Sequence, residues 1–311
     1  MNAKKLFPSI LTLLIAQSVS AGQVGSFTGT ADAVEAAPGG AFAYQDDLAR
    51  PKELLVREIL QKAARRIGTR SALNGTAHDK SAQNRILLEF LYAHKNDGPV
   101  RGEPAYKFDT IDAIWALGEV GDGNTAKYLE QMQKNADSTE KVNIAAALNK
   151  LKADTLSVIP VDGIKTGDIL FRKGYFGMLN SAIGVKQVGH AGVVVGEENG
   201  ELMVVEGWAP VKKTNFIGFV KDWPYYGNRT TSPAPNAEQR KKIADYAIAQ
   251  LGKPYSMSHI HQKGPEKFDC VGLAEAAYEH VGLNPTPDSF EFGLGWPLTP
   301  MEQYEHTFPG K

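Results

Sequence analysis

The sequence predicts an α+β protein in which a helical first half precedes a second half that mixes strands and helices. From Ala49 to Leu151, apolar residues recur every three or four positions, which is the period of helices with one buried face. From Leu156 onward, β-branched residues and tight turns appear, which indicates strands. The change of pattern places a domain boundary at residues 155 and 156, and 311 residues are enough for two domains.

The composition is that of an ordinary globular protein. Hydrophobic residues make up 42% of the chain and charged residues 22%. A formal net charge of -1 gives no electrostatic reason to expect nucleic acid or an anionic membrane as the partner.

The N-terminal residues 1–21 have the pattern of a signal peptide. Lys4 and Lys5 precede an apolar run, and the small residues before Gly22 fit a cleavage site after Ala21. We therefore expect an exported bacterial protein, periplasmic or secreted. The apolar run is too short to span a bilayer, so no stable membrane span is expected after cleavage, although an uncleaved anchor is an alternative. Residues 22–45 are small and polar, which predicts a flexible lead-in.

Residues 46–155 are predicted to form a helical domain. Pro51 suits the first turn of its first helix, and Gly68 suits the end of that helix. The stretch DAIWALGEVGDGNTAKYLEQMQ, residues 112–133, followed by KVNIAAALNKLK, residues 141–152, resembles the HEAT-like repeat over about one and a half units. Paired helices of this kind need neighbours to bury their faces. This domain is expected either to dock a protein partner or to cover the active site. The alternative is a plain helical bundle with no recognition role.

The second half, residues 156–311, contains the elements on which the functional prediction depends. Residues 198–200 are predicted to join two strands into a hairpin. The helix after residue 236 begins with a capping box, and the helix after residue 269 has an aspartate as its N-cap. The predicted strands are 167–171, 189–195, 201–206 and 214–220, and the predicted helices are 236–251 and 270–281.

Cys270 is the only cysteine of the chain, and it lies in the first turn of a predicted helix behind Asp269. The unpaired N–H groups and the dipole of a helix N-terminus favour a thiolate, which is the nucleophilic form of cysteine. The alternative is a small buried hydrophobic residue, which is the commoner role of a free cysteine. In an exported protein, however, an unpaired cysteine is unusual enough to indicate a useful thiol.

A thiolate hydrolase needs a base beside the sulfur and a third group that orients the base. His190 begins an apolar strand between two glycines, where packing gives no reason for a polar side chain, and Glu206 ends the next strand. A two-residue turn at Asn199 and Gly200 would put His190 and Glu206 on opposite faces of the sheet. A three-residue loop with Gly200 left-handed would instead make them diagonal neighbours on one face. The catalytic interpretation predicts the second register.

His259 and His261 are spaced like half of a metal site. No cysteine or nearby carboxylate pair completes the set, so we expect a cleft lining or an exposed loop there. Neither a metal nor a cofactor is predicted.

The blocks around these residues resemble the NlpC/P60 cysteine hydrolases. AQLGKPY at 249–255 and FDCVGL at 268–273 are similar to that family's Q-L-G-K-P-Y and F-D-C-S-G-L. IKTGDILF at 164–171 is similar to its L-x-P-G-D-L-V-F-F strand, and the strand from His190 to its histidine block. The histidine block comes first here, as in the circularly permuted branch that includes YiiX-like proteins. The resemblance covers Val161 to Pro300.

The resemblance implies a permuted papain-like fold, with an antiparallel sheet against helices and the cysteine at a helix start. It implies that Cys270 is the nucleophile, His190 the base and Glu206 the orienting group. Tyr255, Asp269 and Val271 are implied as substrate-binding or oxyanion residues. Val271 replaces the family serine, and residues 256–258 replace the family's W-G-G, which puts the substrate preference in question.

The expected function is that of an exported cysteine hydrolase that cleaves amide bonds through an acyl-thioester, in peptidoglycan stem peptides. One alternative is an acyl-amide or ester hydrolase, or an acyltransferase, acting on a lipid or lipoprotein; an apolar tunnel in place of a narrow polar groove would favour it. Another alternative is a non-catalytic cell-wall-binding module, against which the intact set of Cys270, His190 and Glu206 argues.

Overall fold

The structure is a computed structural model that describes residues 49–68, 79–94, 105–174, 188–256, 263–286 and 298–310. All of them belong to one compact unit, Asp47–Lys311. The predicted signal peptide and lead-in lie outside the described residues. The boundary at 155 and 156 stays a prediction.

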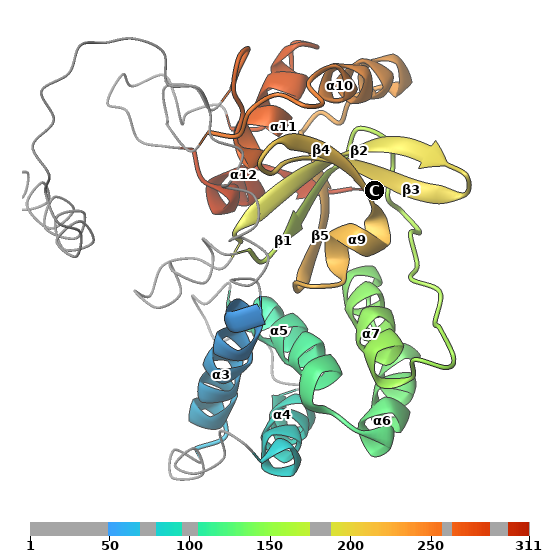
Figure 1. The fold of residues 1–311 in the computed structure, drawn as a ribbon, viewed down its shortest axis with the longest axis vertical. Helices are drawn as coiled ribbons and strands as arrows, with labels where there is room; N and C mark the ends of the chain where they lie inside the picture. Colours follow the sequence, from blue (N-terminus) through green and yellow to red (C-terminus); the bar gives the residue numbers. More distant parts are fainter. Residues whose placement is uncertain are drawn as a thin grey trace, which may run out of the picture. The chain divides into compact units, whose positions relative to one another are not determined.

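Among the described residues, five helices precede the first strand, as the apolar periodicity predicts (Figure 1). Asp122 and Asp137 begin the fourth and fifth of them with capping boxes, in which the aspartate accepts main-chain N–H groups of the first turn. Their apolar faces share one core. The likeness to a HEAT-like repeat stays a prediction. The helices are α3 (Ala49–Arg66), α4 (Lys80–His94), α5 (Ala105–Val120), α6 (Gly123–Gln133) and α7 (Ser138–Leu151).

The second half contains an antiparallel sheet with the strand order β4-β3-β2-β1-β5-β6. This confirms the predicted α+β class with an antiparallel sheet packed on helices. The strands are β1 (Ile169–Arg172), β2 (His190–Glu198), β3 (Glu201–Gly207), β4 (Val211–Asn215), β5 (Tyr225–Thr230) and β6 (Phe308–Pro309); the helices are α9 (Phe216–Val220), α10 (Ala237–Ala249), α11 (Cys270–Glu279) and α12 (Pro300–His306).

Helices cover both faces of this sheet (Figure 1). Alternate strand residues such as Phe171 and Val193 share a core with α10 and α11. The residues between them, such as Leu170 and Val194, pack with α9 and α7. Asn143 of α7 also holds β5, because its side chain donates to the Tyr225 carbonyl at 2.7 Å and accepts from the Tyr225 N–H at 2.9 Å. The helical segment is therefore tied directly to the sheet.

The β2–β3 hairpin has the register that the catalytic interpretation predicts, but not through the predicted loop. Its turn is the two-residue Asn199 and Gly200, both with positive φ, and next to the turn Glu198 pairs with Glu201. A β-bulge between Val194 and Gly196 then shifts the pairing by one residue, so that Val194 faces Val204. Gly196 has φ +119° there, a conformation that glycine adopts without strain.

The predicted strand over residues 214–220 is wrong. The structure ends β4 at Asn215 and continues as the short helix α9. Asn215 causes this change, because its side chain accepts the Gly218 N–H at 2.8 Å and so caps the helix. Strand β5 was not predicted, since its aromatic start runs into the polar residues Gly227 to Arg229.

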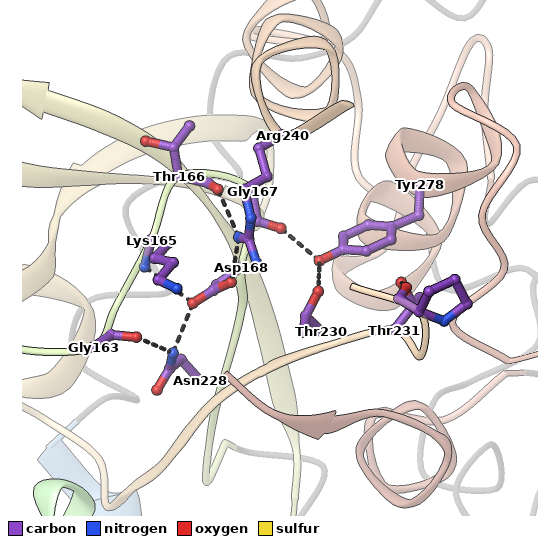
Figure 2. A network of polar contacts seen from close by, with 11 residues as sticks. Gly163, Lys165, Thr166, Gly167, Asp168, Asn228, Thr230, Thr231, Arg240 and Tyr278 are labelled. Atoms are coloured by element: carbon purple, nitrogen blue, oxygen red, sulfur yellow. Dashed lines mark hydrogen bonds and ion pairs between the residues drawn. The ribbon is translucent and has the colours of Figure 1, made fainter. Parts of the chain in front are cut away.

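Asp168 of the predicted G-D motif is a structural residue. Figure 2 shows its buried carboxylate among partners from β5, from α10 and from the turn that precedes β1. It accepts from Arg240 at 2.6 Å, from Asn228 at 2.7 Å and from the Lys165 N–H at 3.0 Å. Beside it, the Tyr278 hydroxyl donates to the Gly167 carbonyl at 2.6 Å. The motif thus fastens the start of β1 to α10 and α11.

Within the described ranges, no helix combines the length and apolar character that crossing a membrane requires.

Candidate active site

Four element ends meet at one end of the sheet. Strand β1 ends at Arg172, which pairs across the ladder with His190 at the start of β2. Strand β3 ends at Gly207, and α11 begins at Cys270. The fold therefore brings together chemically active side chains from segments far apart in the sequence.

His190 and Glu206 form the centre of this site. The His190 Nε2 and Glu206 Oε2 atoms lie 2.6 Å apart, and the two residues are 1% and 3% exposed. The imidazole also contacts the Trp208 ring edge-on, with ring centroids 5.2 Å apart, and lies 5.8 Å from the Phe219 ring. Because the bond to Glu206 uses Nε2, Nδ1 is the nitrogen left for proton exchange.

Cys270 occupies the predicted place, as the first residue of α11. Asp269 is its N-cap, and the Asp269 carboxylate accepts the Gly272 N–H at 2.6 Å. The end of β3 presses against this helix start, because a Cβ on Gly207 would lie 2.5 Å from the Asp269 carbonyl oxygen and 2.9 Å from the Cys270 nitrogen. A glycine after Glu206 thus lets the carboxylate and the cysteine share one corner of the fold.

The thiol of Cys270 is buried between main-chain groups. The N–H groups of Ala191, next to His190, and of Val271 hydrogen-bond to it. No hydrogen bond joins the thiol to the His190 ring in the part of the chain that the structure describes.

The Cys270 thiol is not the ready thiolate that its place at a helix N-terminus led us to expect. Its burial, followed by the charge of the Asp269 carboxylate, raises the pKa of Cys270 to about 12. The Ala191 and Val271 N–H groups and the Arg172 guanidinium act in the opposite direction without offsetting this rise. Burial outweighs the helix start, and the thiol is protonated at neutral pH.

The imidazole is also uncharged at neutral pH. Burial, followed by the charge of Arg172, lowers the pKa of His190 to about 4, although the Glu206 carboxylate favours the protonated form. Burial raises the pKa of Glu206, but the hydrogen bond to His190 and the charges of His190, Arg172 and Lys212 outweigh it and lower that pKa to about 2. The site therefore holds a carboxylate, a neutral imidazole and a thiol.

Arg172 is a residue of this site that the sequence-based prediction missed. Its Nη2 lies 3.4 Å from Glu206 Oε2, and its side chain is 7% exposed. Lys212 approaches the other carboxylate oxygen, Oε1, at 3.6 Å and is 47% exposed. The available signal was a basic pair, Arg172 and Lys173, directly after the apolar run 169–171.

Lys173 points away from the site and into the helical segment. Its fully buried ammonium lies 2.9 Å from Asp112 Oδ2 in α5 and 3.7 Å from Glu58 Oε1 in α3. The Tyr226 hydroxyl donates to the other Asp112 oxygen at 2.7 Å. The residue after Arg172 is thus anchored among the first helices.

The predicted substrate-binding residues lie close to Cys270 in the fold. Tyr255 is half-buried and pairs by a β-bridge with Phe268, two residues before Cys270. Asp269 caps α11, and the Val271 side chain is 1% exposed in the apolar core while its N–H faces the thiol. Their roles toward a substrate stay predictions.

His259 and His261 lie outside the described residues, and no cluster of three or more metal-binding side chains occurs among the residues that are described.

Comparison with known proteins supports the permuted arrangement. Residues 163–293 match the family model of the permuted papain-like amidases, YaeF/YiiX, C92 family. No curated protein matches the chain. A crystal structure of the metalloprotein yiiX from Escherichia coli O157:H7 is 24% identical over 45% of this chain and 79% of that chain, with a TM-score of 0.35.

The family match spans His190, Glu206 and Cys270, and it agrees with a sheet whose histidine strand precedes the cysteine helix. Residues 163–293 are thus similar to the permuted papain-like amidases, a family of cysteine hydrolases.

Proposed function

We propose that this protein is an exported cysteine hydrolase that cleaves amide bonds in peptidoglycan stem peptides through a Cys270–His190–Glu206 mechanism. One observation carries the proposal: the 2.6 Å contact of His190 with Glu206 lies at the sheet end where Cys270 begins α11. A thiol, an imidazole and a carboxylate at one end of the sheet are the three groups that a thiolate hydrolase uses as nucleophile, base and orienting group.

The first step forms a thioester. The Cys270 thiol gives its proton to His190 Nδ1 as the sulfur attacks the amide carbonyl carbon, and the carbonyl electron pair moves onto the oxygen. The Cys270 main-chain N–H at the start of α11, with Tyr255 as the second donor, stabilises this oxyanion. Collapse of the intermediate breaks the C–N bond, and His190 returns the proton to the departing amine.

The second step hydrolyses the thioester. His190 takes a proton from water, the oxygen attacks the thioester carbon, and the sulfur departs and regains a proton. The Glu206 carboxylate holds the imidazole through Nε2 and balances its transient positive charge. With a neutral thiol and a neutral imidazole at rest, proton transfer accompanies the attack, so His190 acts as a general base.

The substrate class follows from the predicted location. A signal peptide over residues 1–21 would deliver the enzyme outside the cytoplasm, where stem peptides are the abundant cross-linked amides of the bacterial wall. Trp208 beside His190, and Lys212 beside Glu206, offer a flat apolar surface and an exposed cation to such a peptide.

The test is digestion of purified sacculi by the protein and by its Cys270→Ala variant, with soluble products identified by mass spectrometry. Peptide fragments with new amino termini, released by the intact protein alone, would support the proposal and identify the bond. Cleavage of acylated lipoprotein without any action on sacculi would favour the lipid-directed alternative. Binding to sacculi without cleavage of either substrate would indicate a wall-binding module.

A further inference from the structure

We propose that Arg172 is a positioning residue of the active site, whose guanidinium shares one Glu206 oxygen with His190 and keeps the imidazole in the uncharged form that accepts a proton. The inference rests on the proposed function, because it assigns His190 the part of a base. Arg172 is the cross-strand partner of His190 in the β1–β2 ladder, so the two side chains stand side by side. Glu206 Oε2 lies 2.6 Å from His190 Nε2 and 3.4 Å from Arg172 Nη2.

The charges around the imidazole explain how sharing the Glu206 oxygen with Arg172 keeps His190 uncharged. With Arg172 in place, Glu206 already has a permanent cation as its buried partner, and a protonated His190 would put a second cation on the same oxygen. In the described parts of the chain, the other charged or titratable groups that face this cluster are Lys212 on β4, Asp269 and Cys270 at α11, and Asp222 after α9. Asp222 pairs with Lys52 of α3 at 2.6 Å. Arg172 is thus the buried cation among them.

Contacts on several sides fix the guanidinium in this position. Its carbon lies 4.9 Å from the centre of the Phe219 ring, 5.8 Å from that of Trp208 and 5.9 Å from that of Trp223. Its Nη1 donates to the Lys173 carbonyl at 3.1 Å. Phe219 and Trp208 also contact His190, so the same two aromatic rings hold the imidazole and the guanidinium in place. The planar guanidinium lies against these aromatic rings.

The direct test is an NMR titration of His190 in protein labelled at histidine, with His190→Gln used to assign its signal. This measurement needs no substrate, so its result does not depend on whether the proposed function is right. We expect the pKa of His190 to rise by at least about 1 unit in Arg172→Gln, a tenfold change in proton affinity. Arg172→Lys, which keeps the charge, should leave it within about 0.3 units of the wild type.

Lys212→Gln is the matched control, because Lys212 lies near the same carboxylate but in contact with solvent, which screens its charge. It should move the pKa of His190 by less than Arg172→Gln does. An unchanged pKa of His190 in folded Arg172→Gln would overturn the proposal, as would an equal shift in Lys212→Gln. If Arg172→Gln does not fold, Arg172→Lys decides: a His190 pKa near that of the wild type supports the proposal, and a rise of about 1 unit overturns it.

Once a substrate is known, the same variants separate positioning from simple destabilisation. In Arg172→Gln, the acid limb of the kcat/KM profile should move upward with the pKa of His190, and kcat should fall more than KM changes. Loss of folded protein alone would reduce kcat and leave the limb in place, and that result would contradict the proposal.

Discussion

His190 and Glu206 lie on one face of the sheet because Val195 is an extra residue in β2. Next to the turn, the hairpin pairs Glu198 with Glu201, a register that would send Glu206 to the face opposite His190. The bulge between Val194 and Gly196 shifts the pairing by one position, and the two side chains then meet at 2.6 Å. The geometry of the proposed base thus depends on a backbone irregularity at Val195, farther along the same strand.

We predict that Gly196→Val inactivates the enzyme by opposing this bulge. A β-branched residue at φ +119° costs about 1–3 kcal/mol, and the register that relieves it separates His190 from Glu206. Deleting Val195 in the same protein removes the extra residue but retains both flanking pairs, so it should restore sacculus cleavage. Equal activity of Gly196→Val and the wild type would contradict the part given to the bulge.

Gly207→Ala should separate β3 from the start of α11. Its Cβ would lie 2.5 Å from the Asp269 carbonyl oxygen, which is main chain and cannot rotate away. A displacement of about 1 Å at the nucleophile can cost about a hundredfold in rate. The kcat of sacculus cleavage is the measurement, with Gly123→Ala as the control, since a Cβ at Gly123 meets no atom within 4 Å. A Gly207→Ala enzyme as fast as this control would show that the contact is not needed.

The labelling rate of Cys270 should reveal a protonated thiol. Because burial raises the pKa of Cys270 to about 12, alkylation by iodoacetamide should accelerate about tenfold per pH unit from pH 7 to 10 without reaching a plateau. In urea the exposed thiol should react faster at each of these pH values. A fast rate that is already constant at pH 7 would mean that a thiolate exists at rest.

On the acid side, kcat/KM should fall only as the pH drops through about 4, where His190 takes up a proton and ceases to be a base.

Asp112→Ala should destabilise the whole compact unit, because it leaves the fully buried Lys173 ammonium without its nearest partner. Breaking a buried ion pair costs about 3–5 kcal/mol, whereas Asp245→Ala, which breaks the exposed pair with Lys241, should cost under about 0.5 kcal/mol. Urea unfolding followed by circular dichroism measures both changes. We also expect one transition for the helices and the sheet together; two transitions would mean that this anchor does not join them.

The sequence was sufficient for the features that local patterns encode. Asp269 ahead of an apolar helical stripe predicted the N-cap and placed Cys270 in the first turn, and the Asn236 capping box was equally local. The alternation in the two hairpin strands, with the demand that His190 meet Glu206, predicted the register at the catalytic end.

Features that depend on burial and on distant segments did not follow from the sequence. A bulge at Val195 cannot be seen in an apolar run, because each residue there suits a strand. The Cys270 pKa is set by how deeply the thiol is buried, which opposes the helix-terminus effect that the sequence shows. Arg172 becomes part of the site only when β1 pairs with β2.

The central claim is that Cys270 carries the acyl group during cleavage. The most direct measurement is to quench sacculus digestion in acid during turnover, and to map the peptide that contains Cys270 by mass spectrometry. We predict an added stem-peptide acyl group on Cys270 that hydroxylamine removes, as it removes thioesters, and no cleavage by Cys270→Ala. Release of fragments while Cys270 stays unmodified, with Cys270→Ala as active as the wild type, would contradict this mechanism.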